Sequence, residues 1–90
     1  MSQLHILNKA PGHPRFNACL AAVQPGDSLL LVEDGVLACA DARTRWPDQV
    51  QLMALAADLD ARGIAPAAGI STTDYAQWVT LTMALASQSW

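Results

Sequence analysis

Charged residues are scarce in this chain of 90 residues, and the few that occur are not grouped. Only 14% of the residues are charged, against about 25% in an average soluble domain. The net charge is −3 and the five basic residues are scattered along the chain. The sequence therefore lacks the basic stripe with which proteins hold phosphates, and we do not expect direct binding to nucleic acid.

The motifs that would identify a cofactor-dependent enzyme or a metal site are also missing. The sequence contains no GxGxxG, GxxxxGK[ST], GxSxG or HExxH pattern, each of which would bring a defined mechanism. The two cysteines have neither the CxxC nor the Cys/His spacing of a zinc site. The sequence therefore predicts no cofactor and no bound metal.

Long hydrophobic runs are absent as well. Hydrophobic residues make up 52% of the chain, yet no run approaches the roughly eighteen residues of a transmembrane helix. Residues 1–5 lack the basic start and apolar core of a secretory signal. We expect a cytoplasmic protein without a membrane span, in which the excess of apolar residues is covered in part by another subunit.

The predicted fold is organised around residues 28–35, where four consecutive apolar residues precede two carboxylates and a glycine. An unbroken apolar run is typical of a parallel strand covered on both faces by helices. Apolar runs at 4–7 and 50–56 flank it at distances that leave room for one helix each, and 70–71 can add a brief fourth strand. The sequence thus predicts one α/β domain over 1–90. It is a small three-layer, Rossmann-like fold with a mostly parallel sheet of three to four strands.

The first predicted helix begins at Pro14, because a proline in the first helical turn loses no hydrogen bond there. Phe16, Cys19, Leu20 and Val23 then recur at the spacing of one apolar helix face. This pattern places Cys19 on the buried side of the helix, where a cysteine most often serves as a small core residue.

Three further helices are predicted. Residues 36–42 form a short helix capped by Asp34 or Gly35, and 57–63 form another that ends at its glycine. The last helix starts after an N-cap within 71–74 and docks on the sheet, while 87–90 trail from it. Its docking stripe is predicted to comprise Tyr75, Trp78, Val79, Thr82 and Leu85.

Isolated aromatic and histidine residues receive less specific interpretations. Trp46 and Trp90 are interface candidates, since tryptophan is enriched at the energetic centres of protein interfaces, whereas Trp78 is expected in the core. His5 lies within a strand, where a single histidine is more often a hydrogen-bonded core residue than a catalytic base. Because open α/β sheets bind ligands beyond the carboxyl ends of their strands, the loops at 8–12, 33–35 and 56–58 are the regions to inspect.

Four blocks of the sequence, at 4–11, 29–36, 58–63 and 74–90, resemble the DsrH/TusB family of sulfur-relay proteins in order and separation. The resemblance implies a DsrEFH-like fold and a cytoplasmic accessory subunit that joins TusC/DsrF-like and TusD/DsrE-like partners in a heterohexamer. In the Tus branch of the family, persulfide sulfur passes through a TusE-like carrier toward 2-thiolation of the tRNA wobble uridine. In the Dsr branch, the complex exchanges sulfur with a DsrC-like protein during sulfur oxidation. The sequence leaves the choice of branch open.

The resemblance also bears on Cys19, which coincides with a cysteine of DsrH-type members. A persulfide carrier needs an accessible thiolate that attacks a donor's sulfane sulfur, and burial opposes both requirements. The family's principal sulfur-bearing cysteine belongs to the TusD/DsrE-type partner. We therefore prefer a non-catalytic subunit, with a sulfur carrier using Cys19 and a binding module unrelated to sulfur as the alternatives. Cys39 matches no family cysteine and is interpreted as a packed residue.

Overall fold

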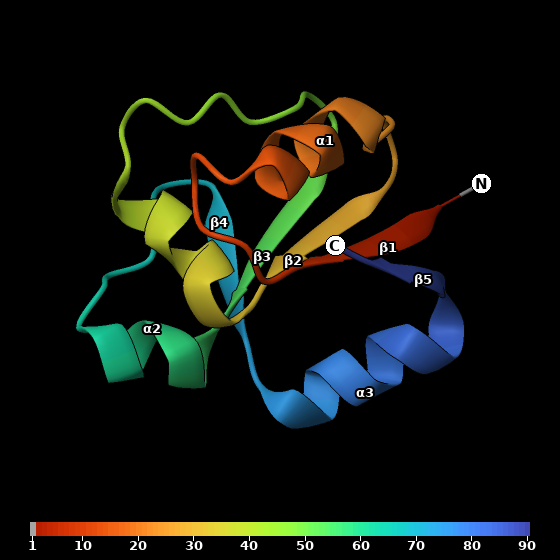
Figure 1. Ribbon diagram of the computed structural model, residues 1–90. Coiled ribbons are helices and arrows are strands. Elements are labelled where there is room, and N and C mark those ends of the chain that lie inside the picture. The colour runs from red at the N-terminus through yellow and green to blue at the C-terminus, as the bar shows by residue number, and fades with distance from the viewer. Residues whose placement is uncertain (1) are drawn as a thin grey trace.

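The computed structural model describes residues 2–90 and shows an alternation of strands and helices around one parallel sheet (Figure 1). The five strands have the order β4-β3-β2-β1-β5, and every neighbouring pair is parallel. The α/β fold predicted from the sequence is confirmed, although the sheet has five strands rather than three or four. The elements are β1 (Gln3–Leu7), α1 (Pro14–Ala22), β2 (Ser28–Leu31), the 3₁₀-helix η1 (Glu33–Ala40), β3 (Gln51–Leu55), α2 (Ala56–Arg62), β4 (Ile70–Thr73), α3 (Tyr75–Ala84) and β5 (Ala86–Ser89).

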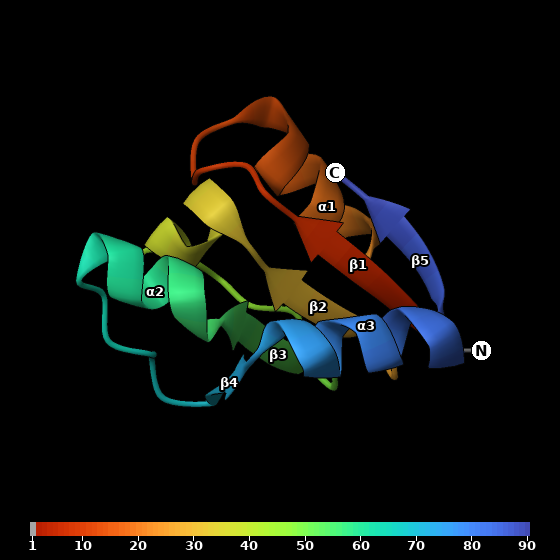
Figure 2. The same ribbon diagram turned by 90° about the horizontal axis from the view of Figure 1, so that it is seen from below.

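Helices cover the two faces of the sheet unequally. α1 and η1 lie on one face with α2 at its end, and α3 alone crosses the other face (Figures 1 and 2). We call these the α1 face and the α3 face. The buried core of the α1 face comprises Leu7, Phe16, Cys19, Val23, Leu29, Leu31, Val36, Ala38, Ala54, Leu59 and Ile70. The core of the α3 face comprises Leu4, Leu30, Val32, Met53 and Leu55.

The central strand β2 is buried on both sides, as its unbroken apolar run predicts. All four of its residues are buried, and its side chains alternate between the two cores, with Leu29 and Leu31 on the α1 face and Leu30 on the α3 face. Strand pairing with β1 and β3 satisfies its backbone on both edges. Because neither face of β2 meets water, the strand has no need of polar side chains on either face.

The C-terminal segment departs from the prediction that it trails from the last helix. Residues 86–89 form β5, which pairs with β1 along the edge of the sheet, and the backbone N–H of Trp90 donates to the Ile6 carbonyl oxygen at 2.9 Å. All four β5 residues are exposed, so no apolar alternation marks the strand in the sequence. The unpaired backbone groups of β1 determine its conformation instead.

The segment after β2 forms its helix earlier than predicted. η1 begins at Glu33, its N-cap is Val32, and no side chain caps it, so Asp34 and Gly35 lie inside the first turn rather than at the cap. Gly35 is required for a different reason. A Cβ at this position would collide with the carbonyl oxygen of Leu7, because the turn brings the two backbones into contact.

α3 has a different inner face from the one predicted. The partly buried side chains that pack on the core of the α3 face are Trp78, Leu81 and Leu85. Tyr75 and Val79 are each 58% exposed, so their predicted docking on the sheet is wrong. The helix start is as expected, since Asp74 forms a capping box with Gln77.

Candidate functional site

Cys19 lies where its spacing predicts, on the inner side of α1, and it is fully buried. Its neighbours in the core of the α1 face include Phe16 and Val23. Burial raises the pKa of the Cys19 thiol to about 12, because an apolar surrounding disfavours the thiolate. At neutral pH this sulfur is therefore a protonated, inaccessible thiol in the described conformation.

Cys39 is the second free cysteine and lies in η1, partly buried against the same core. Burial raises the pKa of its thiol, and a backbone hydrogen bond from Ala67 acts in the opposite direction. Cys39 lies in the last turn of η1, away from the helix N-terminus, where a thiol pKa can be lowered. Neither cysteine has the electropositive, accessible surrounding that reactive cysteines share.

The carboxyl ends of the strands bring together acidic residues that the sequence left scattered. Glu33, immediately after β2, has a positive φ of 49°, and its backbone N–H donates to Asp58 Oδ2 at 2.6 Å. The Arg62 guanidinium lies 3.1 Å from Asp34 and 3.7 Å from Asp58. These contacts hold the β2–η1 turn against α2, so the arrangement is a structural one.

A buried polar network joins β1 to the loop before β2. His5 is 2% exposed and Asp27 is 4% exposed, and His5 Nε2 lies 3.0 Å from Asp27 Oδ2. Asp27 also accepts the backbone N–H groups of Gln3 and Gln24, each at 3.0 Å. These hydrogen bonds, led by that from Gln24, lower the pKa of the Asp27 carboxyl.

Trp90 completes this network from the other end of the chain. Its indole N–H donates to His5 Nδ1 at 3.2 Å, and the two rings stack with centroids 6.1 Å apart. An indole nitrogen can only donate, so Nδ1 must be the acceptor and Nε2 carries the proton donated to Asp27. The interaction fixes the tautomer of His5. His5 is thus the hydrogen-bonded core residue that its position in a strand suggests.

The two interface candidates both contact the body of the domain. Trp46 is partly buried in the connector before β3 and packs on the core of the α1 face. Trp90 is also partly buried against the core of the α1 face. Arg15 Nε donates to the backbone oxygen of Trp90 at 2.9 Å, and the Arg15 guanidinium lies 5.8 Å from the centroid of the Trp90 ring. Both tryptophans therefore have intramolecular roles, and an additional role in subunit contacts stays a prediction.

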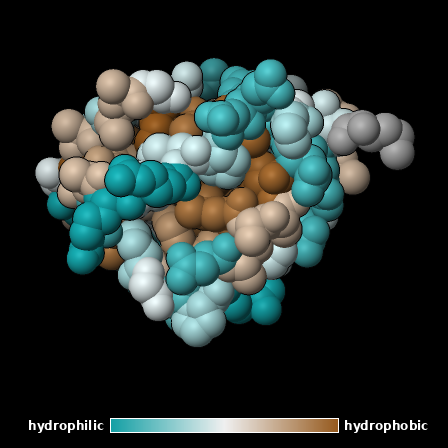
Figure 3. Space-filling model, turned by 90° about the horizontal axis from the view of Figure 1, so that it is seen from above, coloured by the Kyte–Doolittle hydropathy of each residue, from teal (hydrophilic) through white to brown (hydrophobic). Residues whose placement is uncertain are grey.

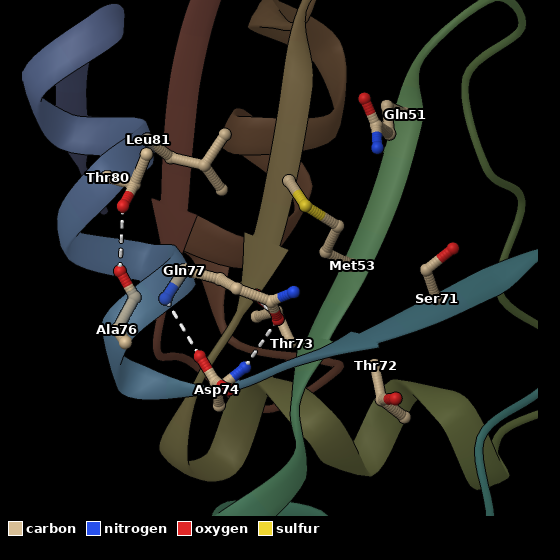
Figure 4. Close-up of a pocket in the computed structure, with 10 residues that line it drawn as sticks. All are labelled: Gln51, Met53, Ser71, Thr72, Thr73, Asp74, Ala76, Gln77, Thr80 and Leu81. Atoms are coloured by element: carbon tan, nitrogen blue, oxygen red, sulfur yellow. Dashed lines mark hydrogen bonds between the residues drawn. The ribbon is translucent and has the colours of Figure 1, made fainter.

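Two open cavities lie on opposite faces of the domain. One, of about 480 Å³, lies between α1 and the connector after η1, on the side where apolar surface is visible between polar residues (Figure 3). The other, of about 530 Å³, lies beside α3 over β3 and β4 (Figure 4). Met53 and Leu81 contribute its apolar part, and Thr73 and Gln77 are hydrogen-bonded to one another at its side. Neither cavity contains a cysteine.

Two other kinds of site have requirements that the described residues 2–90 do not meet. Among them, no helix has the length and apolar character to cross a lipid bilayer. The same residues contain no group of three or more His, Cys, Asp or Glu side chains placed to hold a metal ion.

The sequence did not reveal two distinctive features of the structure, the buried Asp27 network and the outward apolar side chains of α3. Asp27 was missed because its partners lie up to 24 residues away along the chain, and no local pattern marks such contacts. The outward apolar side chains of α3 had a visible signal, since Tyr75 and Val79 are four residues apart and lie on one helix face. That signal was assigned to the inner face.

Known proteins resemble this chain along most of its length. A family model described as "DsrH like protein" matches residues 9–88. Relatives named "Protein TusB" include one from Enterobacter sp. (strain 638), 39% identical over 67 residues, which are 69% of this chain and 70% of the relative. Another, from Escherichia coli O81 (strain ED1a), is 36% identical over 92 residues, covering 94% of this chain and 96% of the relative.

A solved structure supports the fold. The solution NMR structure of Protein Tm0979 from Thermotoga maritima superposes with a TM-score of 0.70 over 93% of each chain, at 17% sequence identity. At this identity the likeness concerns the fold alone, and it agrees with the parallel sheet described above. The family match and the TusB relatives confirm the resemblance noted in the sequence, and the chain belongs to the family of DsrH-like proteins.

Proposed function

We propose that this chain is an accessory subunit of a cytoplasmic sulfur-relay complex that serves 2-thiolation of the tRNA wobble uridine. Its role is to assemble with TusC/DsrF-like and TusD/DsrE-like subunits in a heterohexamer, from which a TusE/DsrC-like carrier receives sulfur. The similarity to proteins named TusB over 94% of the chain favours this branch of the family.

The observation that carries the accessory role is the environment of Cys19. A sulfur carrier must present a thiolate to a donor and then present the persulfide to an acceptor. Cys19 is fully buried, and burial raises its pKa to about 12. Both steps would require α1 to leave the sheet, so the side chain is better suited to filling the core than to carrying sulfur.

Co-expression of the chain with its TusC-like and TusD-like partners tests this proposal. We expect the three proteins to co-purify as one complex that supports tRNA thiolation, and the Cys19→Ala variant to retain both properties. A matched substitution of the partly buried thiol, Cys39→Ala, is the control for the loss of a cysteine from the same core. Failure of the chain to co-purify with these partners would refute the proposal of a subunit.

The alternative, a carrier that uses Cys19 itself, predicts a different result. Incubation of the folded chain with a persulfide donor would then add one sulfur atom to Cys19, detectable by mass spectrometry of the peptide that contains it. Cys19→Ala and Cys19→Ser complexes would assemble normally and lose thiolation. Serine introduces a hydroxyl into an apolar core and can disturb the fold by itself. Only a loss of thiolation in both the alanine and the serine variant would therefore support the carrier.

A further inference from the structure

The hydrogen bond between Trp90 and His5 depends on the protonation state of His5. The indole N–H of Trp90 donates to His5 Nδ1 at 3.2 Å, while Nε2 of the same ring donates to Asp27. In a protonated imidazole both ring nitrogens carry a hydrogen and neither can accept. The Nδ1–H and the indole N–H would then be two donors facing one another. The bond to Trp90 can therefore exist only while His5 is neutral.

Trp90 is also the side chain that attaches the segment 86–90 to the domain. This segment lies at the edge of the sheet beside β1 (Figure 2). All four β5 residues are exposed, whereas Trp90 is partly buried and packs on the core of the α1 face. The other attachments are backbone hydrogen bonds to β1, the bond from Arg15 to the Trp90 carbonyl oxygen, and a 3.4 Å hydrogen bond between the Gln3 and Gln88 side chains. The segment thus has one anchoring side chain in the core.

Two charged groups near this anchor respond to protonation of His5 in opposite ways. The Asp27 carboxylate, 3.0 Å from Nε2, attracts an imidazolium and keeps it in place. The Arg15 guanidinium lies 5.8 Å from the centroid of the Trp90 ring, and the His5 ring lies 6.1 Å from it. Protonation therefore places a second cation beside the same indole. The charged His5 is held by Asp27, and the contact that is lost is the one to Trp90.

The elements that pack around His5 carry other titratable groups. Cys19 on α1 and Cys39 on η1 share the core of the α1 face, and burial raises the pKa of both thiols, so they stay neutral. Asp27 is already charged in neutral solution, because its hydrogen bonds lower its pKa. His13 is the exposed N-cap of α1 and accepts the backbone N–H of Arg15. Histidine is the side chain that normally changes charge between about pH 5 and 8, so His13 serves as the comparison for His5.

We propose that protonation of His5 releases the segment 86–90 from the sheet. With neutral His5, the indole of Trp90 is held and β5 pairs with β1. When His5 takes up a proton from solvent, Nδ1 becomes a donor, the indole leaves its site, and β5 separates from β1. His5 remains bound to Asp27 through Nε2 in both states, so the other four strands stay paired. The release requires no thiol chemistry and does not rest on the proposed sulfur-relay function.

Nuclear magnetic resonance of the ¹⁵N-labelled chain between pH 8 and pH 5 tests the release. We expect the ring nitrogens of His5 to report the Nε2–H tautomer at pH 8 and the imidazolium at pH 5. Over the same step, the indole N–H signal of Trp90 should move to the position of an indole without this bond. Hydrogen-exchange protection of the β5 amides, corrected for the intrinsic effect of pH, should fall roughly tenfold, as expected for the loss of one hydrogen bond. The β3 amides should keep their protection.

Three variants separate this release from a general effect of acid. His5→Gln keeps a side-chain N–H for Asp27 and cannot take up the proton, so protection of β5 should not change with pH. Trp90→Phe keeps an aromatic ring and removes the indole N–H, so protection of β5 should already be reduced at pH 8 and change little toward pH 5. His13→Gln makes the same change at the other histidine and should retain the tenfold response of the wild type.

Four results would overturn the proposal. They are a His5 that stays neutral down to pH 5, a protonated His5 with unchanged β5 protection, parallel losses of protection in β3 and β5, and equal responses of His5→Gln and His13→Gln. The first three are measured on the wild-type chain, so the proposal is tested even if His5→Gln does not fold. None of these results depends on whether the chain assembles with sulfur-relay partners.

Discussion

Replacing Asp27 with asparagine removes one negative charge while keeping the side-chain shape almost unchanged. In the folded protein this carboxylate accepts three hydrogen bonds. Oδ1 accepts the backbone N–H of Gln3, and Oδ2 accepts both the backbone N–H of Gln24 and the Nε2–H of His5, each at 3.0 Å. The side chain therefore holds β1 and the loop before β2 together from a buried position.

Asparagine cannot reproduce these contacts in either orientation. If its oxygen occupies the Oδ2 position, its amide N–H₂ faces the N–H of Gln3; in the flipped orientation it faces two donors instead of one. His5 cannot accept from the amide by changing its tautomer, because Trp90 already donates to Nδ1. At least one buried donor is left without an acceptor, and the remaining bonds lose their ionic character.

One unsatisfied buried donor costs about 1–3 kcal/mol, and the loss of a charged acceptor weakens the other hydrogen bonds. We therefore expect Asp27→Asn to lower the free energy of unfolding by roughly 2–4 kcal/mol. For a domain of this length, that corresponds to a fall in Tm of roughly 10–30 °C. The free energy of unfolding of a typical protein is about 5–15 kcal/mol, so the expected loss is a large fraction of the total stability.

Thermal unfolding followed by circular dichroism measures this effect. Asp48→Asn makes the same chemical change at an exposed position in the connector before β3, and such surface substitutions usually change stability by no more than about 0.5 kcal/mol. If Asp27→Asn and Asp48→Asn unfold at the same temperature, the network contributes little and our account of it is wrong.

Three further predictions concern pH, thiol reactivity and backbone packing. Because the pKa of Asp27 is lowered in the folded state, its contribution to stability is present above the unfolded pKa and is lost as the pH falls through the lower folded value. The wild-type Tm should therefore fall toward that of Asp27→Asn in acid. In the native protein, a maleimide should label Cys39 before Cys19, whose labelling should require denaturant, since its pKa is about 12. Gly35→Ala should lower the free energy of unfolding by about 1–3 kcal/mol, measured by urea denaturation, because its Cβ would collide with the Leu7 carbonyl oxygen.

Each of these predictions has a contrary result. An unchanged difference in Tm between wild type and Asp27→Asn from neutral to acid pH would contradict the lowered pKa. Labelling of Cys19 as fast as Cys39 in the native protein would show that α1 opens readily. A Gly35→Ala variant as stable as wild type would mean that the β2–η1 turn can move away from β1.

The parts of the fold that were predicted correctly are those determined by local pattern. The run 29–32 can only be a strand if both of its faces are covered, and Pro14 begins α1 because it lacks the N–H that the first turn does not use. The burial of Cys19 follows directly from its place on the apolar face of that helix. Patterns of this kind involve residues that are close together along the chain, so they can be recognised in the sequence alone.

The features that were missed depend on residues far apart in the chain. Strand β5 is polar, fully exposed and defined by its pairing with β1, so nothing in residues 86–89 predicts it. Trp90 and His5 are separated by 85 positions. On α3, both rows of apolar residues have helical spacing, and only packing on the sheet decides that the row with Trp78 faces inward.

The pairing of β5 with β1 also has a consequence for the order in which the protein is completed on the ribosome. β1 is synthesised long before β5, and its outer edge is covered only when residues 86–89 have emerged. Until then the nascent chain presents a row of free N–H and C=O groups, to which strands of other chains can add. Closing so long a loop is also slow compared with local helix formation. Newly made copies should therefore be most prone to aggregate before residues 86–89 have emerged and paired with β1.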